Sequence, residues 1–332
     1  MIEIDGSEGG GQMLRTALGL SAVTGKPFSM HNIRSSRPQP GIRVQHLEAT
    51  NAVATICDAE VEGNVMDSTE LSFKPKEIKS GRVKIKVGTA GSVGLILQAV
   101  LIPASQSKIR VMVEGGATYG AWAQPMDSLW NVTIPMLGKM GYNVKVRNVQ
   151  HGFYPKGGAR VEVVSDKAEL KPVEILDKGK LIALKGVSVA SSSLERPQVA
   201  ARQADAAKYL IKESLKKEID ILVLYKETSC PGSGITLWAE CENSVIGGDS
   251  FGEKTKRAEI VGAEAAQRLI FELENSAVDS YTADQLMPYM AMAGKGKIKT
   301  SKITDHMKTN ASIIEKFLDV KFTFKDNIIS VA

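Results

Sequence analysis

The chain contains few cysteines and few histidines, and it has no long apolar run. Its 332 residues include only three cysteines, Cys57, Cys230 and Cys241, and four histidines. No two cysteines form a CxxC pair, so the sequence argues against a zinc site and against a disulfide-rich secreted scaffold. We therefore expect a reducing compartment, with the cytoplasm as the default. A Cys230–Cys241 disulfide is the one pairing left open.

The sequence also lacks the segments that would place a protein in a membrane or send it across one. No stretch approaches the roughly 18 uninterrupted apolar residues of a membrane helix. The start, MIEIDGSEGGGQ, lacks a basic segment followed by an apolar one. The composition, 43% hydrophobic and 24% charged residues, is typical of a globular protein with one large or two modest domains. The net charge of +5 weakly favours anionic partners such as nucleotides or RNA.

A pattern of strand, polar loop, helix and two strands recurs along the chain. It occurs in residues 28–75, 108–164 and 296–332. A helix-period stretch precedes each copy, in residues 9–23, 91–102 and 282–293. We interpret the pattern as three copies of a unit with two helices and a four-stranded sheet. Such units bury their sheet faces only by packing together.

The third copy is interrupted by residues 181–274, which have a rhythm of their own. They read as strand, helix 198–215, strand, glycine turn, strand and helix 255–273. That is enough chain for a small inserted α/β domain. The expected fold class is therefore α/β (α+β), with a large domain of residues 1–180 plus 275–332 and a small domain of residues 181–274.

The stretch GSEGGGQMLR is a glycine-rich turn ahead of an expected helix. Three glycines let backbone N–H groups approach an anion closely, and the helix N-terminus favours negative charge there. Glu8 could hold a divalent ion beside phosphates. Arg15 lies off the apolar stripe of the helix, so it either lies at the surface or points at whatever the turn binds. An ordinary strand-to-helix turn is the alternative.

The loop IRSSRPQPGIRVQHL carries Arg34, Arg37 and Arg43 within ten residues. Its prolines stiffen the loop, and rigidly placed guanidinium groups suit bidentate phosphate binding. The helix that follows Gly41 places Gln45 and His46 away from its core-facing stripe. A solvated basic loop without a ligand is the alternative.

Aromatic residues near acidic and glycine-rich segments are the next candidates. Phe251, in FGEKTKR, and Tyr281, in SYTADQ, could stack on a base, and Asp284 could contact a ribose or a metal. Core packing is the alternative for both rings. The segment HGFYPKGGARVEV, residues 151–163, indicates a hairpin with a bulge.

His306 stands in the stretch TDHMKTNASIIEKFL. Thr309 or Asn310 could cap the helix that follows, so we expect His306 in a loop just before that helix begins. A neutral imidazole there is an available nucleophile, and the helix dipole helps to hold a phosphate. No second His or Cys stands at metal-ligand spacing. A surface histidine without a function is the alternative.

Taken together, these segments resemble the RNA 3′-terminal phosphate cyclases. The resemblance runs in order through DGSEGGGQMLR, IRSSRPQPG, QHL, VGTAGSVGLILQ, HGFYPKGG, YTADQL and HMKTNASIIEKFL, and so spans nearly the whole chain. The HGFYP-x-GG segment is the most characteristic of them. The resemblance implies a three-repeat fold with a small domain inserted in the third repeat. It also implies ATP-dependent conversion of RNA 3′-phosphate ends to 2′,3′-cyclic phosphodiesters with a divalent metal, Mg²⁺ or Mn²⁺.

The resemblance also implies roles for individual residues. His306 would be the nucleophile that accepts AMP, and Glu8 would bind the metal. Four residues would bind phosphates of the RNA or of ATP, namely Arg15, Arg34, Arg37 and Gln45. Eight would contact ATP, namely Gln98, Pro125, Phe251, Tyr281, Thr282, Ala283, Asp284 and Gln285.

The sequence departs from the family pattern at two positions and leaves other interpretations open. Ala159 stands where a third glycine is common, and Arg43 stands one residue before the position where the arginine is usual. One alternative is a cyclase-like factor in ribosomal RNA processing that lacks the catalytic histidine. Another is an enolpyruvyl transferase, which shares a repeated α/β architecture. The oligomeric state is also open, with a homodimer as one option.

Overall fold

The structure is a computed structural model that describes residues 1–121 and 123–332. Its first sheet contains β1 (Ile2–Asp5), β2 (Phe28–His31), β3 (Glu60–Glu62) and β4 (Leu71–Lys74) in the order β1-β2-β4-β3. Strands β1 and β2 are parallel, and the other pairs are antiparallel. Helices α1 (Gly11–Thr24) and α2 (Val44–Cys57) connect the strands and pack against each other.

The second sheet contains β5 (Gly81–Ser92), β6 (Ile109–Ala117), β7 (Val144–Gln150) and β8 (Arg160–Ser165). Its order, β5-β6-β8-β7, and its pattern of one parallel and two antiparallel pairs match the first sheet. In β5, buried Val83, Ile85 and Val87 alternate with exposed residues, which is the period of a strand with one covered face. Helix α3 (Val93–Ala104) follows β5, and α4 (Met126–Ser128), a π-helical turn η1 (Leu129–Thr133) and α5 (Ile134–Lys139) follow β6.

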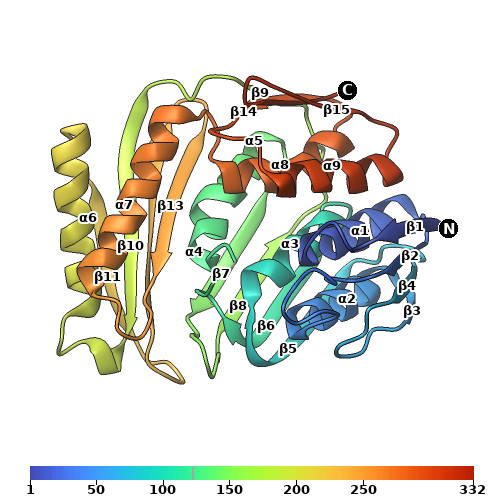
Figure 1. The fold of residues 1–332 in the computed structure, drawn as a ribbon, viewed down its shortest axis with the longest axis horizontal. Coiled ribbons are helices and arrows are strands. Elements are labelled where there is room, and N and C mark those ends of the chain that lie inside the picture. Colours follow the sequence, from blue (N-terminus) through green and yellow to red (C-terminus); the bar gives the residue numbers. More distant parts are fainter. Residues whose placement is uncertain (122) are drawn as a thin grey trace.

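The third sheet draws on distant parts of the chain. It contains β9 (Glu174–Ile175), β14 (Gly296–Lys299), β15 (Phe322–Lys325) and β16 (Ile328–Val331), with helices α8 (Ser280–Met292) and α9 (Asp305–Phe317). Strands β9 and β14 are parallel and the other pairs antiparallel, as in the first two sheets. Helix α1 contacts α2, α3 and α9, and α8 contacts α9. In Figure 1 these helices lie between the sheets, so one core joins all three units.

A fourth sheet separates β9 from α8 in the sequence. It contains β10 (Leu181–Ser191), β11 (Asp220–Lys226), β12 (Ser233–Cys241) and β13 (Val245–Phe251) in the order β11-β10-β12-β13. A short turn η2 (Ser192–Leu194) and helix α6 (Val199–Leu215) follow β10, and α7 (Ala258–Asn275) follows β13. The two helices cover the sheet around a separate hydrophobic core. Figure 1 shows this part beside the three-sheet part.

The mixed α/β fold class is confirmed. The division into domains at residues 180/181 and 274/275 stays a prediction, and α7 extends one residue beyond the second boundary. The three cysteines are buried free thiols, so the Cys230–Cys241 pairing is absent from the structure. Among the helices of the described residues, none combines the length and the apolar character that crossing a bilayer requires.

Candidate active site

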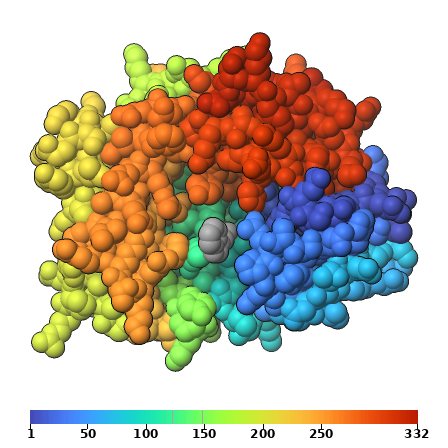
Figure 2. Space-filling model, viewed as in Figure 1, coloured from blue at the N-terminus to red at the C-terminus, as the bar shows by residue number. Residues whose placement is uncertain are grey.

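A cavity of about 2170 Å³ lies between the helices of the three-sheet part and the fourth sheet. Figure 2 shows a hollow in the middle of this face, bordered by segments from the start, the middle and the end of the chain. Its wall on the three-sheet side includes the N-termini of α1 and α9 and one face of α8. Its opposite wall includes β13, the segment that follows it and α7. Side chains from distant parts of the sequence therefore face one space.

The glycine-rich turn brings the N-terminus of α1 to this cavity. Gly10 is the N-cap and offers no side chain to the free N–H groups of the first turn. Neither position has room for a side chain. A Cβ added to Gly11 would lie 1.9 Å from Nε2 of His46, and a Cβ added to Gly10 would lie 3.1 Å from Nη2 of Arg37. The glycines therefore let an imidazole and a guanidinium close over a helix N-terminus, a combination suited to anions.

His306 lies in the first turn of α9, and the prediction of a loop position was wrong. Helix α9 begins at Asp305 because Thr304 caps it, with its Oγ1 accepting a hydrogen bond of 3.2 Å from the N–H of Met307. The two expected caps have other partners. Thr309 donates its hydroxyl to the carbonyl of Asp305 inside the helix. Asn310 is buried and donates to Asp284.

A chain of hydrogen bonds fixes the imidazole of His306. Its Nδ1 lies 2.6 Å from Oε1 of Gln12, and the amide nitrogen of Gln12 donates to Asp284. Asn310 also donates to the Asp284 carboxylate, at 3.0 Å, and accepts a hydrogen bond of 2.8 Å from Thr16. These residues come from α1, α8 and α9, so three helices hold one side chain.

This network determines the tautomer of His306. Gln12 turns its amide nitrogen to Asp284 and its amide oxygen to His306. Nδ1 of His306 must then carry the proton and donate it, which leaves the lone pair on Nε2. Burial raises the pKa of Asp284, while hydrogen bonds from Gln12 and Asn310 and the charge of Arg15 lower it. In the neutral imidazole, this arrangement leaves the free lone pair on Nε2.

Two further groups beside the α1 N-terminus are buried, and of these only His46 was expected to lie away from the core. Arg15 is only 9% exposed, and burial lowers its pKa to about 10, against the opposing effect of Asp284. His46 is buried because Nδ1 accepts the N–H of Arg43 and so caps α2 from inside. Burial, with Arg15 and Arg34 nearby, lowers its pKa to about 3. His46 is therefore neutral and carries its proton on Nε2, beside Gly11.

The other predicted phosphate-binding residues also line the cavity. Arg34 donates to the carbonyls of Gln39 and Gly41 at 2.9 and 2.8 Å, which holds its loop, and burial lowers its pKa. Arg37 and Gln45 complete the group. The arginines and the α1 N-terminus thus concentrate positive potential beside His306.

Five of the predicted ATP-contacting residues line the cavity as well, namely Gln98, Phe251, Tyr281, Asp284 and Gln285. The amide of Gln285 donates to Gln124 at 2.6 Å. The Tyr281 ring is exposed, and the ammonium of Lys256 lies 5.9 Å from the centre of the half-buried Phe251 ring. Two aromatic faces are thus available to a planar ligand.

Four predicted site residues do not reach this cavity in the described part of the chain. Thr282 and Ala283 are fully buried on another side of α8, and Pro125 is buried at the N-cap of α4. Glu8 is exposed in the turn ahead of α1, outside the cavity wall. Among the described residues, no three His, Cys, Asp or Glu side chains gather as metal ligands. The assignment of Glu8 to a divalent ion held beside phosphates stays a prediction.

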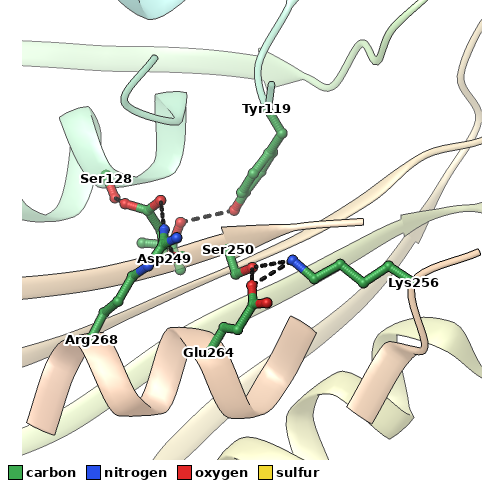
Figure 3. A network of polar contacts seen from close by, with 8 residues as sticks. Tyr119, Ser128, Asp249, Ser250, Lys256, Glu264 and Arg268 are labelled. Carbon is green, nitrogen blue, oxygen red and sulfur yellow. Dashed lines mark hydrogen bonds and ion pairs between the residues drawn. The ribbon is translucent and has the colours of Figure 1, made fainter. Parts of the chain in front are cut away.

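The wall across the cavity is built from charged pairs, shown in Figure 3. Lys256 pairs with Glu264, which also accepts a hydrogen bond of 2.8 Å from Ser250. Arg268 donates to the carbonyl of Asp249 at 2.8 Å. Among the bonds that tie the fourth sheet to the three-sheet part are those from Ser128 to Asp249 at 3.0 Å and between Tyr119 and Thr236 at 2.9 Å. Burial raises the pKa of Asp249 to about 6.

The sequence analysis missed Gln12, Asn310, Thr16 and the buried state of His46. Gln12 stands inside the glycine-rich motif, but its partners are 272 and 294 residues away. Asn310 was predicted as a helix cap because Asn is common at that position, but it lies inside α9 and donates to Asp284. No local pattern of the sequence signals these contacts, and only the packing of α1, α8 and α9 reveals them.

Comparison with known proteins agrees with this geometry. A family model described as RNA 3′-terminal phosphate cyclase matches residues 6–324. A protein of that name from Methanopyrus kandleri is 43% identical, over 96% of this chain and 94% of its own length. The proteins of that name from Saccharolobus solfataricus and Pyrococcus furiosus are 44% and 41% identical, over 97% and 99% of this chain and 95% and 96% of their own lengths.

Proposed function

Since the chain belongs to the RNA 3′-terminal phosphate cyclase family, we propose that it converts an RNA 3′-phosphate into a 2′,3′-cyclic phosphodiester at the expense of ATP. One observation carries the proposal furthest. His306, held at Nδ1 by Gln12, lines a cavity whose adjoining wall offers a helix N-terminus and three arginines. Such a site suits a nucleophile that attacks a phosphate group.

The proposed reaction has three steps. First, Nε2 of His306 attacks the α-phosphorus of ATP, a P–N bond forms, and the bond to pyrophosphate breaks. Second, an oxygen of the RNA 3′-phosphate attacks the same phosphorus, which transfers AMP to the RNA and restores the imidazole. Third, the neighbouring ribose 2′-oxygen attacks the activated 3′-phosphate, loses its proton and expels AMP. The last step is fast because nucleophile and phosphate share one ribose.

The hydrogen-bond chain supplies what the first step needs. The imidazole becomes positively charged as Nε2 forms its bond to phosphorus, and Nδ1 keeps its proton. Gln12 and the Asp284 carboxylate behind it stabilise that charge. Arg15, Arg34 and Arg37 would bind phosphate oxygens of ATP and then of the RNA end. Neutral His46 offers Nε2–H to the same anion without a charge of its own.

We assign the nucleotide to the wall around α8. Tyr281, Gln98 and Gln285 lie on this side of the cavity and Phe251 lies across it on β13, so that two rings and two amides are available for an adenosine. Thr282 and Ala283 support this wall from the buried side of the helix. A divalent ion, Mg²⁺ or Mn²⁺, would enter with the phosphates of ATP, since the described residues do not form a site for it alone.

The test is a labelling experiment with ATP that carries ³²P at the α-phosphorus. We expect label on the protein in the absence of RNA, stable to base and labile to acid, and mapping by mass spectrometry to His306. RNA with a 3′-phosphate should discharge the label and yield a cyclic end, whereas RNA with a 3′-hydroxyl should leave it. A His306→Ala variant should lose the label. The matched control, His31→Ala, should keep it, because His31 is exposed on β2. Absence of label on folded protein with ATP and metal would contradict the proposal.

A further inference from the structure

The turn between β7 and β8 places an aromatic ring at the edge of the cavity. Phe153 and Gly157 form an isolated bridge, and Tyr154 and Pro155 lie between them. Phe153 is only 3% exposed, whereas Tyr154 is 77% exposed, yet Tyr154 lines the cavity together with Pro155. This is the segment of the sequence that is most characteristic of the family, and the mechanism proposed above does not use it. An exposed ring at the edge of a cavity has a face available for stacking on a planar ligand.

The backbone of the turn that carries Tyr154 is held in place by contacts of Phe153. The N–H of Gly157 donates to the carbonyl of Phe153 at 2.7 Å. The Phe153 ring stacks on Tyr119, with centroids 6.3 Å apart. Cys230 donates its thiol to the same carbonyl, and a Cβ at Gly232 would lie 2.1 Å from the Phe153 ring. The turn is therefore clamped between the second sheet and the loop that leads into β12.

Close contacts connect this turn to the phosphate-binding group. Gly157 packs against the backbone of Thr89, since a Cβ added to Gly157 would lie 2.7 Å from the Thr89 carbonyl oxygen. Gly91 in turn lies beside the backbone of Gln45, since a Cβ added to Gly91 would lie 3.6 Å from the Gln45 nitrogen. Residues 90–92, between the Thr89 contact and the Gln45 contact, also line the cavity. Tyr154 therefore lies on the same continuous wall as Gln45, but farther out, where the cavity meets solvent.

This position fits the RNA better than the nucleotide. A polynucleotide whose 3′-phosphate reaches His306 must leave the cavity through its mouth, so its bases pass residues that are exposed without it. ATP is small enough to be enclosed, and Tyr281 lies on α8, the helix whose Asp284 belongs to the hydrogen-bond chain behind His306. Base stacking on an exposed tyrosine tolerates any sequence, because every base has a π-face.

We propose that Tyr154 is a stacking platform for a nucleobase at the 3′ end of the RNA substrate, a binding subsite that acts on RNA and not on ATP. Lys254 and Arg257, on the facing segment that lines the same cavity, supply charge for the RNA backbone as it leaves. The inference rests on the proposed function for its substrate, and its test separates the two.

The test compares Tyr154→Ala, Tyr154→Phe and wild type in two assays. Labelling of His306 by ATP without RNA should be unchanged in both variants, because that step precedes RNA binding. The KM for a short oligonucleotide with a 3′-phosphate should rise about 5- to 150-fold in Tyr154→Ala, which corresponds to the roughly 1–3 kcal/mol of one stacked base. Tyr154→Phe should keep the wild-type KM, because it keeps the ring. Tyr209→Ala is the matched control, since Tyr209 is 69% exposed on α6 and lies outside the cavity wall.

Direct binding keeps the inference testable if the proposed chemistry fails. Fluorescence anisotropy with a labelled 3′-phosphate oligonucleotide should show the same loss of affinity in Tyr154→Ala. An oligonucleotide with abasic sites at its last two positions should bind both proteins equally. Unchanged KM and affinity in Tyr154→Ala would overturn the inference, as would a Tyr154→Phe variant as weak as Tyr154→Ala. Loss of His306 labelling in wild type would instead overturn the proposed function.

Discussion

The two walls of the cavity hold their polar groups in different ways. On the wall of α1, α8 and α9, amides and one carboxylate bind each other in a chain that ends at His306. On the wall of β13 and α7, lysine and arginine pair with acids. Amide networks fix direction, since donor and acceptor cannot exchange, whereas ion pairs tolerate movement. The first wall therefore holds its polar groups in fixed directions, whereas the second holds paired charges that can move.

The largest effect should come from removing the nucleophile on the first wall. His306→Ala should abolish covalent labelling by ATP, because no other described side chain presents a free imidazole nitrogen there. The fold should survive, since His306 is exposed. Labelling by α-³²P-ATP and a thermal unfolding scan on the same sample measure both outcomes. Full cyclisation of RNA ends by His306→Ala would contradict the assignment of the nucleophile to the wall of α1, α8 and α9.

Gln12→Ala should lower the labelling rate by about two orders of magnitude, because it removes the partner that orients His306 and fixes its tautomer. A positioning role leaves a signature that lost packing would not. In ¹⁵N NMR of the ring, wild-type His306 should carry its proton on Nδ1, and the variant should show mixed tautomers. The pH profile of labelling should shift as well. An unchanged tautomer in Gln12→Ala would show that the hydrogen bond does not direct His306.

The sequence allowed parts of this fold to be predicted because some of its signals are local. The helix-period stretches depend on neighbours along the chain, so the helix predicted at residues 91–102 lies within a few residues of α3. The site was harder. His306 and the arginines came from resemblance to a family, and the network behind them could not be predicted, because Gln12 meets Asp284 across 272 residues.

Two errors in the prediction have physical causes. The start of α9 was placed too late because Thr309 and Asn310 are good caps by composition, but Thr304 occupies that position with extended backbone angles. His46 was expected away from the core because the prediction assumed that α2 buries a single apolar face. The helix contacts α1, α3 and β5, and therefore buries more than one face.

A smaller effect is expected from the ion pair on the second wall. A double-mutant cycle with Lys256→Met and Glu264→Gln should give a coupling free energy of about 1 kcal/mol in unfolding, because the pair is partly shielded from water. Labelling of His306 should fall by no more than a few-fold in either variant. The matched control is the Lys212–Glu218 pair, which is mostly exposed and should show a coupling near zero. A large loss of His306 labelling in Lys256→Met would mean that Lys256, on the wall of β13 and α7, also takes part in the reaction with ATP.

The smallest effect concerns Asp279, which joins the walls by accepting the N–H of Thr282 in α8 and the N–H of Gly247 in β13. Burial and the nearby Glu272 raise its pKa to about 7. Between the ordinary aspartate pKa of about 4 and pH 7, the folded protein keeps a proton that the unfolded chain has lost. Its contribution to stability should therefore fall as the pH rises through this window and level off above pH 7.

The measurement is the midpoint of thermal unfolding from pH 4.5 to 8.5 in wild type and in Asp279→Asn. Asparagine stays neutral and keeps one oxygen acceptor, so the variant should lose stability at low pH and show a shallower fall as the pH rises. Some slope should remain, because the pKa values of Asp249 and Asp284 are raised in the same direction. Parallel curves for the two proteins would mean that the contact between the walls at Asp279 does not titrate, and that the pH dependence arises within the walls themselves.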